Sequence, residues 1–134
     1  MERAFETGSR KRRPNEIDAG ILLEIAQWYV RSGMPGALGW LWEQEGDGTA
    51  LVSEATDTTT AAQICVYYDA VGALYKHGLI DDALLFDWLT IAGVWDRIKG
   101  YVQADRRRQG DPHLWSCFEE LARAHKRAIG EYST

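Results

Sequence analysis

The chain has few of the residues that staple small proteins together covalently or through a metal. It contains only two cysteines in 134 residues, Cys65 and Cys117, and neither belongs to a CxxC pair. A disulfide framework or a structural zinc site needs more cysteines at closer spacing. Both cysteines lie in apolar helical patterns, so we expect two free, buried thiols in a reducing compartment.

Long hydrophobic runs are missing as well. No stretch approaches the roughly 18 apolar residues of a membrane span, because the most apolar region is interrupted by Asp69, Lys76, Asp87 and Asp96. The first thirteen residues have no apolar centre of the kind found in secretory signal peptides. These features predict a cytoplasmic protein.

Signatures of catalysis and of cofactor binding are also lacking. The 13 glycines do not form a GxxxxGK or GxGxxG loop of the kind that binds phosphates. One Cys–His pair shares a helix face, His113 and Cys117, but Cys117 lies in a packing stripe, where a thiol is unreactive. His77, Asp81 and Asp82 meet at a predicted turn with a single imidazole, which favours turn and cap chemistry over a metal site. We therefore expect no enzyme, no cofactor and no metal.

Positive charge is scarce beyond the N-terminus. The net charge is −5, whereas residues 1–13 hold five basic and two acidic side chains, a local +3 that leaves −8 for the rest. An acidic body is a poor partner for phosphate backbones. Only the basic tail suits nucleic acid or an anionic membrane, although a flexible, solvated segment over residues 1–14 is the simpler interpretation. Its basic run is Arg10, Lys11, Arg12 and Arg13.

Apolar residues recur at helical spacing through most of the remaining chain. The predicted helices cover about 16–31, 37–43, 57–78, 81–107 and 111–130, and the second of them is short. Their start signals are Asp57 to Thr60, Asp81 and the pair Asp111-Pro112. The sequence thus predicts one all-α domain over residues 15–134, a helical bundle of about four main helices plus one short helix. Its expected core comes from Tyr68, Trp88, Trp95, Trp115 and Phe118.

The order of aromatic, acidic and turn residues in the middle of the chain resembles a known family. The pattern consists of Tyr68-Asp69 on one helix, the turn Gly78-Leu79-Ile80-Asp81, and a helix that carries Trp95 and ends at Arg106 to Arg108. It is similar to a set of small, all-helical bacterial domains catalogued as a domain of unknown function, over roughly residues 20–125. Many of those relatives look like the cytoplasmic part of a membrane-tethered chain, whereas this chain has a basic tail there. The resemblance implies a fold and transfers no catalytic residue.

One candidate site lies between the two helices that flank this turn. Asp69 is nine residues before Gly78 and Asp87 is nine after it, so antiparallel packing would bring the two carboxylates to one level. Such a pair, or one carboxylate facing Arg97, would have perturbed pKa values. The simpler interpretation is a buried aspartate paired with an arginine or a tyrosine hydroxyl. Because bundles build sites between facing helices, a small-molecule pocket is one hypothesis. Its lining would be Tyr68, Asp69, Tyr75, Asp87 and Trp95.

A second candidate is the aromatic segment at Trp40 and Trp42. Two tryptophans separated by one residue cannot both point inward from a short helix, so at least one is expected to be exposed or to pack against another chain. Exposed aromatics often mark interaction surfaces. The first functional hypothesis is therefore a non-enzymatic interaction module that self-associates, as a homodimer, or binds another protein. The alternatives are the small-molecule pocket and an adaptor that uses the basic tail.

Overall fold

The computed structural model describes residues 14–53 and 55–133, and these form a helical domain without strands. The helices are α1 (Glu16–Arg31), α2 (Met34–Trp42), a 3-10 turn η2 (Thr49–Ser53), α3 (Ala55–Lys76), α4 (Asp82–Trp88), α5 (Ala92–Gln109) and α6 (Ser116–Ser133). The all-α prediction is confirmed. The predicted basic tail lies outside the described residues, apart from its last residue, Pro14.

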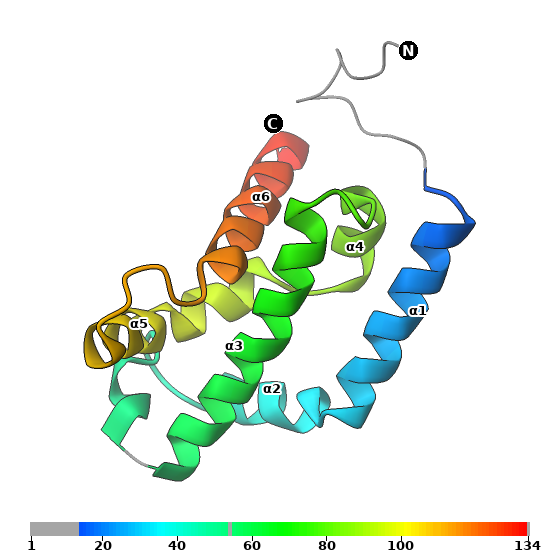
Figure 1. Ribbon diagram of the computed structural model, residues 1–134. Coiled ribbons are helices and arrows are strands. Elements are labelled where there is room, and N and C mark those ends of the chain that lie inside the picture. The colour runs from blue at the N-terminus through cyan, green and yellow to red at the C-terminus, as the bar shows by residue number, and fades with distance from the viewer. Residues whose placement is uncertain (1–13, 54, 134) are drawn as a thin grey trace.

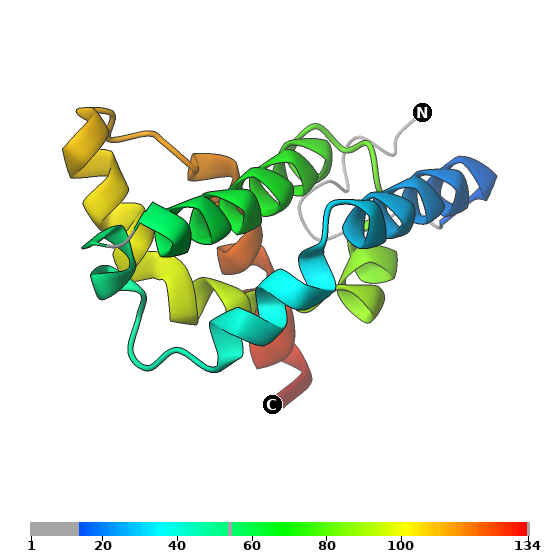
Figure 2. The same ribbon diagram turned by 90° about the horizontal axis from the view of Figure 1, so that it is seen from below.

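Helix α3 runs through the middle of the molecule, and the other helices are arranged around it (Figure 1). It packs most extensively against α6, and this contact is close because Gly72 faces the backbone of α6. A Cβ atom at Gly72 would collide with the carbonyl group of Cys117. Helix α1 lies at one edge of the domain, with α2 leading from it past α3 towards α5 (Figure 2).

The core lies where α3, α5 and α6 meet. Tyr68 stacks on Phe118 with ring centroids 5.1 Å apart, and Trp95 meets Phe118 edge-to-face at 5.0 Å. All three side chains are buried, as the sequence predicts. Trp115 is half-buried and packs against this core. Trp88 is exposed, so its prediction as a core residue is wrong. Trp88 lies instead at the mouth of a cleft described below.

Helix α1 begins and ends where the periodicity predicts. Asn15 and Asp18 form a capping box, in which each side chain accepts a hydrogen bond from the backbone N–H of the other residue. Asp18 is almost fully buried and also accepts from the backbone N–H of Asp81 at 3.0 Å. In turn, Asp81 accepts from the N–H of Leu84 and caps α4. One carboxylate thereby joins the starts of two helices far apart in the sequence.

The single helix predicted over 81–107 is wrong, because the chain breaks between Trp88 and Ala92. Leu89 is extended, with φ −105° and ψ 129°, and the carbonyl of Thr90 accepts a 2.9 Å hydrogen bond from the hydroxyl of Tyr68. The new helix has no cap from its own N-cap residue; Nδ1 of His125, from α6, accepts from the N–H of Ala92 at 3.0 Å. Tyr68 on α3 and His125 on α6 therefore stabilise this break between two helices. No local sequence pattern predicts it. With it, the described residues hold six α-helices rather than four main ones and a short one.

The start of the last helix is also later than predicted. Asp111 forms a turn, in which its carboxylate accepts from the N–H of His113 at 2.9 Å, and α6 begins only at Ser116. The intervening segment is held by α5: the indole of Trp115 donates to Asp105 and Arg106 donates to the carbonyl of Leu114. Trp115 has a φ of 63°, a left-handed conformation that interrupts a helix.

Two smaller predictions need correction at other helix starts. Helix α3 already begins at Ala55, so the predicted capping residues from Asp57 to Thr60 lie inside it. The hydroxyl of Thr58 donates to the carbonyl of Leu51 in η2. Helix α2 begins at Met34 rather than at 37, so Pro35 lies in its first turn, where its missing N–H costs no hydrogen bond.

Candidate functional site: an aromatic cleft

The site is a cleft at the junction of α2, the end of α1 and the break between α4 and α5. Helix α2 contributes Pro35, Leu38, Gly39 and Trp42, which recur at helical spacing and share one face. Tyr29 comes from α1 and Tyr68 from α3, while Trp88, Leu89 and Thr90 come from the end of α4 and the extended link after it. The cleft has a volume of about 470 Å³.

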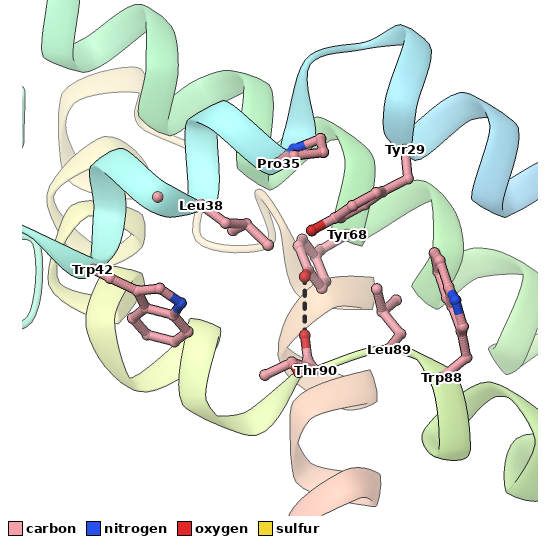
Figure 3. Close-up of a pocket in the computed structure, with 9 residues that line it drawn as sticks. Tyr29, Pro35, Leu38, Trp42, Tyr68, Trp88, Leu89 and Thr90 are labelled. Carbon is pink, nitrogen blue, oxygen red and sulfur yellow. Dashed lines mark hydrogen bonds between the residues drawn. The ribbon is translucent and has the colours of Figure 1, made fainter.

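Tyr68 forms the rigid floor of the cleft. Its side chain is 0% exposed, its ring stacks on Phe118, and its hydroxyl is hydrogen bonded to the carbonyl of Thr90 (Figure 3). Burial raises the pKa of Tyr68 well above its usual value, so the hydroxyl stays neutral. The same hydrogen bond fixes the extended link that carries Leu89 into the cleft wall. The floor and one wall are therefore positioned by a single buried side chain.

Two tryptophans form the rims. Figure 3 shows Trp42 and Trp88 on opposite sides of the cleft, with Tyr68 between them. Trp42 is 42% exposed and Trp88 is 40% exposed. Trp88 packs edge-to-face on Tyr29, with ring centroids 5.5 Å apart. Both indoles thus present apolar surface to solvent at the mouth of one cavity.

Arg97 holds one rim of the cleft, Trp42, in place. Its guanidinium lies 4.8 Å from the ring centroid of Trp42, a cation–π geometry. One of its nitrogens also donates to the carbonyls of Trp42 and Gln44, at 3.1 and 3.0 Å, which ties the end of α2 to α5. Trp42 is therefore ordered before any ligand arrives, and this reduces the entropic cost of binding.

The lining of the cleft is suited to uncharged groups. None of the nine described residues that line it carries a charged side chain. Burial raises the pKa of Tyr29, so this hydroxyl is also neutral and serves as a hydrogen-bonding group at the edge of an apolar surface. An uncharged apolar or aromatic group fits these properties, whereas a phosphate or carboxylate finds no cationic group in the lining.

The sequence predicted a pocket between the helices that flank Gly78. The residues predicted to line it lie in several different environments. Tyr68 lines the observed cleft, and Trp95 lies outside its lining and packs, like Tyr68, against Phe118. Tyr75 packs against Phe86, with ring centroids 6.0 Å apart. Asp87 is exposed on α4. Asp69 accepts a 3.0 Å hydrogen bond from the backbone N–H of Phe118 and thereby caps α6 from α3.

The two predicted interaction residues, Trp40 and Trp42, also lie in different environments. Trp40 is half-buried and packs against the core, and its carbonyl accepts from the side chain of Gln44. Trp42 is exposed and belongs to the cleft. Sequence reasoning thus named two cleft residues, Tyr68 and Trp42, for separate reasons. It had no signal for the link at Leu89 and Thr90, which lies at the unpredicted helix break.

The remaining candidates from the sequence are the two cysteines, a metal site and a membrane-spanning helix. Burial, and then the negative charge of Asp69, raise the pKa of the Cys117 thiol, which disfavours the reactive thiolate. Cys65 is fully buried, and its thiol pKa is raised by that burial. In the part of the chain that the structure describes, no three His, Cys, Asp or Glu side chains are grouped so as to hold a metal ion. Over the same residues, no helix is both long and apolar enough to cross a membrane.

Comparison with known proteins identifies the family. The family described as "Domain of unknown function (DUF4760)" matches residues 18–125, and the chain belongs to it. This confirms the resemblance seen in the sequence. The match begins at the buried Asp18 and ends at His125, the residue that caps α5. No curated protein and no solved structure matches the chain.

Proposed function

We propose that this member of the DUF4760 family is a non-enzymatic interaction module that binds a partner protein through the aromatic cleft. The observation that supports the proposal is the pair of exposed, pre-positioned tryptophans, Trp42 and Trp88, above an uncharged floor. The occupant that fits is a protein segment that inserts one apolar or aromatic side chain between them.

The energetics of such a contact are favourable. Tryptophan is enriched among residues whose truncation costs an interface about 2 kcal/mol or more. Both rims are fixed before binding, Trp42 by Arg97 and Trp88 by Tyr29. Burial of an inserted apolar side chain would contribute about 25 cal/mol of binding free energy per Å² of apolar surface removed from water. Little of this free energy would be lost in ordering the side chains of the cleft.

The test is an NMR titration that follows the indole N–H signals. The probes are indole, N-acetyl-tryptophanamide and a capped Gly-Gly-Trp-Gly-Gly peptide. We expect the signals of Trp42 and Trp88 to shift together, and affinity to rise as backbone is added to the ring. Trp88→Ala should abolish the response. Trp28→Ala is the matched control, because Trp28 is a partly exposed tryptophan outside the cleft that packs on Tyr67.

Each result has a definite meaning. If none of the three probes moves the two indoles at millimolar concentration, or if Trp28→Ala weakens binding as much as Trp88→Ala, the cleft is not the binding surface. If indole alone binds as tightly as the peptide, the occupant is a small molecule rather than a protein segment.

A small molecule is the second candidate, and the size of the cavity favours it. A volume of about 470 Å³ falls within the range of small-molecule sites, which bind mostly through apolar and aromatic walls. The ligand would be uncharged and ring-containing, with a polar group near the hydroxyl of Tyr29. A thermal-shift screen of neutral heterocycles tests this: ligands that raise the midpoint of the wild type and not of Trp88→Ala would support it.

A further inference from the structure

Helix α1 is apolar on two sides, and only one of them is packed. Its inner side includes Ile25, which is buried, and Tyr29, which lies in the cleft. A second side, about 110° around the helix, presents Leu23 and Val30, which are 64% and 67% exposed. Figure 1 places α1 at the edge of the domain, where one side of the helix has no neighbouring helix.

Leu23 and Val30 belong to a regular pattern, which we call the outer face of α1. It consists of Ala19, Leu23, Ala26 and Val30, of which Ala26 is half-buried and the others are exposed. Successive members are four, three and four residues apart. At about 100° per residue these positions fall within an arc of about 60° on the helix. Spacing of this kind is that of the apolar seam between paired helices. These residues thus form a seam that has no partner helix within the described part of the chain.

We propose that the outer face of α1 binds the same face of a second copy, in antiparallel orientation, to form a symmetric dimer. In this arrangement Ala19 lies opposite Val30 of the second copy, and Leu23 lies opposite Ala26. Each small residue therefore meets a large one, which allows close packing without voids. A parallel arrangement would oppose Leu23 to Leu23 and Ala26 to Ala26, so the seam would be alternately crowded and empty.

The charges at the ends of α1 are complementary in the same orientation. Glu16 is exposed at the first residue of the helix and Arg31 at the last. Antiparallel pairing about the centre of the seam brings Glu16 of each copy near Arg31 of the other, on the same flank of the interface. The helix dipoles also run in opposite directions. Parallel pairing would place like charges together at both ends.

The charge of α1 argues against a lipid surface as the occupant. Besides Arg31, the charged residues of the helix are Glu16, Asp18 and Glu24, so it is acidic. Helices that lie on anionic membranes carry lysine and arginine on the polar side instead. The seam is short, because from Ala19 to Val30 it spans about 17 Å. It is therefore expected to give a reversible, concentration-dependent dimer at the lower end of interface sizes.

Sedimentation equilibrium over a range of concentrations tests the dimer. The wild-type chain is expected to pass from monomer to dimer as concentration rises, and Leu23→Glu is expected to remain monomeric. Leu79→Glu is the matched control, because Leu79 is a similarly exposed leucine, at 52%, in the turn before α4. Circular dichroism checks that both variants are folded. A wild-type chain that stays monomeric, or equal weakening by both variants, overturns the proposal.

A charge exchange tests the orientation. Glu16→Arg and Arg31→Glu should each weaken the dimer severalfold, and the double variant should restore it. Failure of the double variant to recover association excludes the antiparallel arrangement. Trp88→Ala should leave the dimer unchanged, so failure of the cleft proposal and failure of this one are distinguishable. Co-sedimentation with anionic vesicles that depends on Leu23 would assign the face to a membrane and refute the dimer.

Discussion

Asp69 is the residue for which a functional and a structural role lead to the most different predictions. It was a candidate for a binding site, yet its carboxylate accepts the N–H of Phe118 at 3.0 Å in the first turn of α6. Trp115, the residue just before that helix, has an indole side chain that cannot accept this hydrogen bond. The cap is therefore supplied by α3, and it should be needed to stabilise α6 against α3.

The magnitude follows from two effects. Loss of a helix cap costs about 1 kcal/mol and up to about 2 kcal/mol, and the higher value applies here because Phe118 is buried and its N–H would lose its partner away from water. Loss of a negative charge near a helix N-terminus costs a further fraction of a kcal/mol, about 0.5 kcal/mol. We expect Asp69→Ala to lower the free energy of unfolding by about 2 kcal/mol. Asp69→Asn keeps an acceptor oxygen and should cost less, about 1 kcal/mol.

Urea unfolding followed by circular dichroism measures these differences. Asp87→Ala is the matched control, because Asp87 is the exposed carboxylate that was paired with Asp69 in the sequence hypothesis. It should stay within about 0.5 kcal/mol of the wild type. A stability of Asp69→Ala equal to that of the wild type, or an equal loss in Asp87→Ala, would refute the assignment of Asp69 as the cap of α6.

Two further predictions concern the packing of α6. The Nδ1 atom of His125 accepts from Ala92, and burial lowers the pKa of this imidazole, so the unfolded chain binds a proton more readily than the folded one. The contribution of neutral His125 to the free energy of unfolding should therefore be fully present above the usual histidine pKa of about 6.5 and should be lost as the pH falls below that value. Urea midpoints measured from pH 8 to pH 5 should show this loss. The His125→Gln variant should not show it. Gly72→Ala should lower the free energy of unfolding by about 2 kcal/mol or more, because its methyl group meets the backbone at Cys117. Gly130→Ala, which meets no atom within 4 Å, should instead raise it by about 0.5 kcal/mol; equal effects of the two glycine variants in urea unfolding would contradict the close α3–α6 contact.

The sequence alone determined the elements whose signals are local. The apolar period predicts the bounds of α1, and Asp81 caps α4 as predicted. The all-helical class and the family resemblance follow from patterns of the same kind. Periodicity and caps act over a few residues, so they can be read from a short stretch of sequence.

The tertiary structure decided where helices break and which aromatics meet. The break before Ala92 depends on Tyr68 and His125, which lie 22 and 33 residues away from their partners in the sequence. The cleft likewise joins Trp42 and Trp88 from separate helices. A hydrogen bond or ring contact between distant residues leaves no local pattern, because its free energy depends on how the helices pack. Sequence therefore named Tyr68 and Trp42 as candidates, and only the packed structure placed them in one cleft.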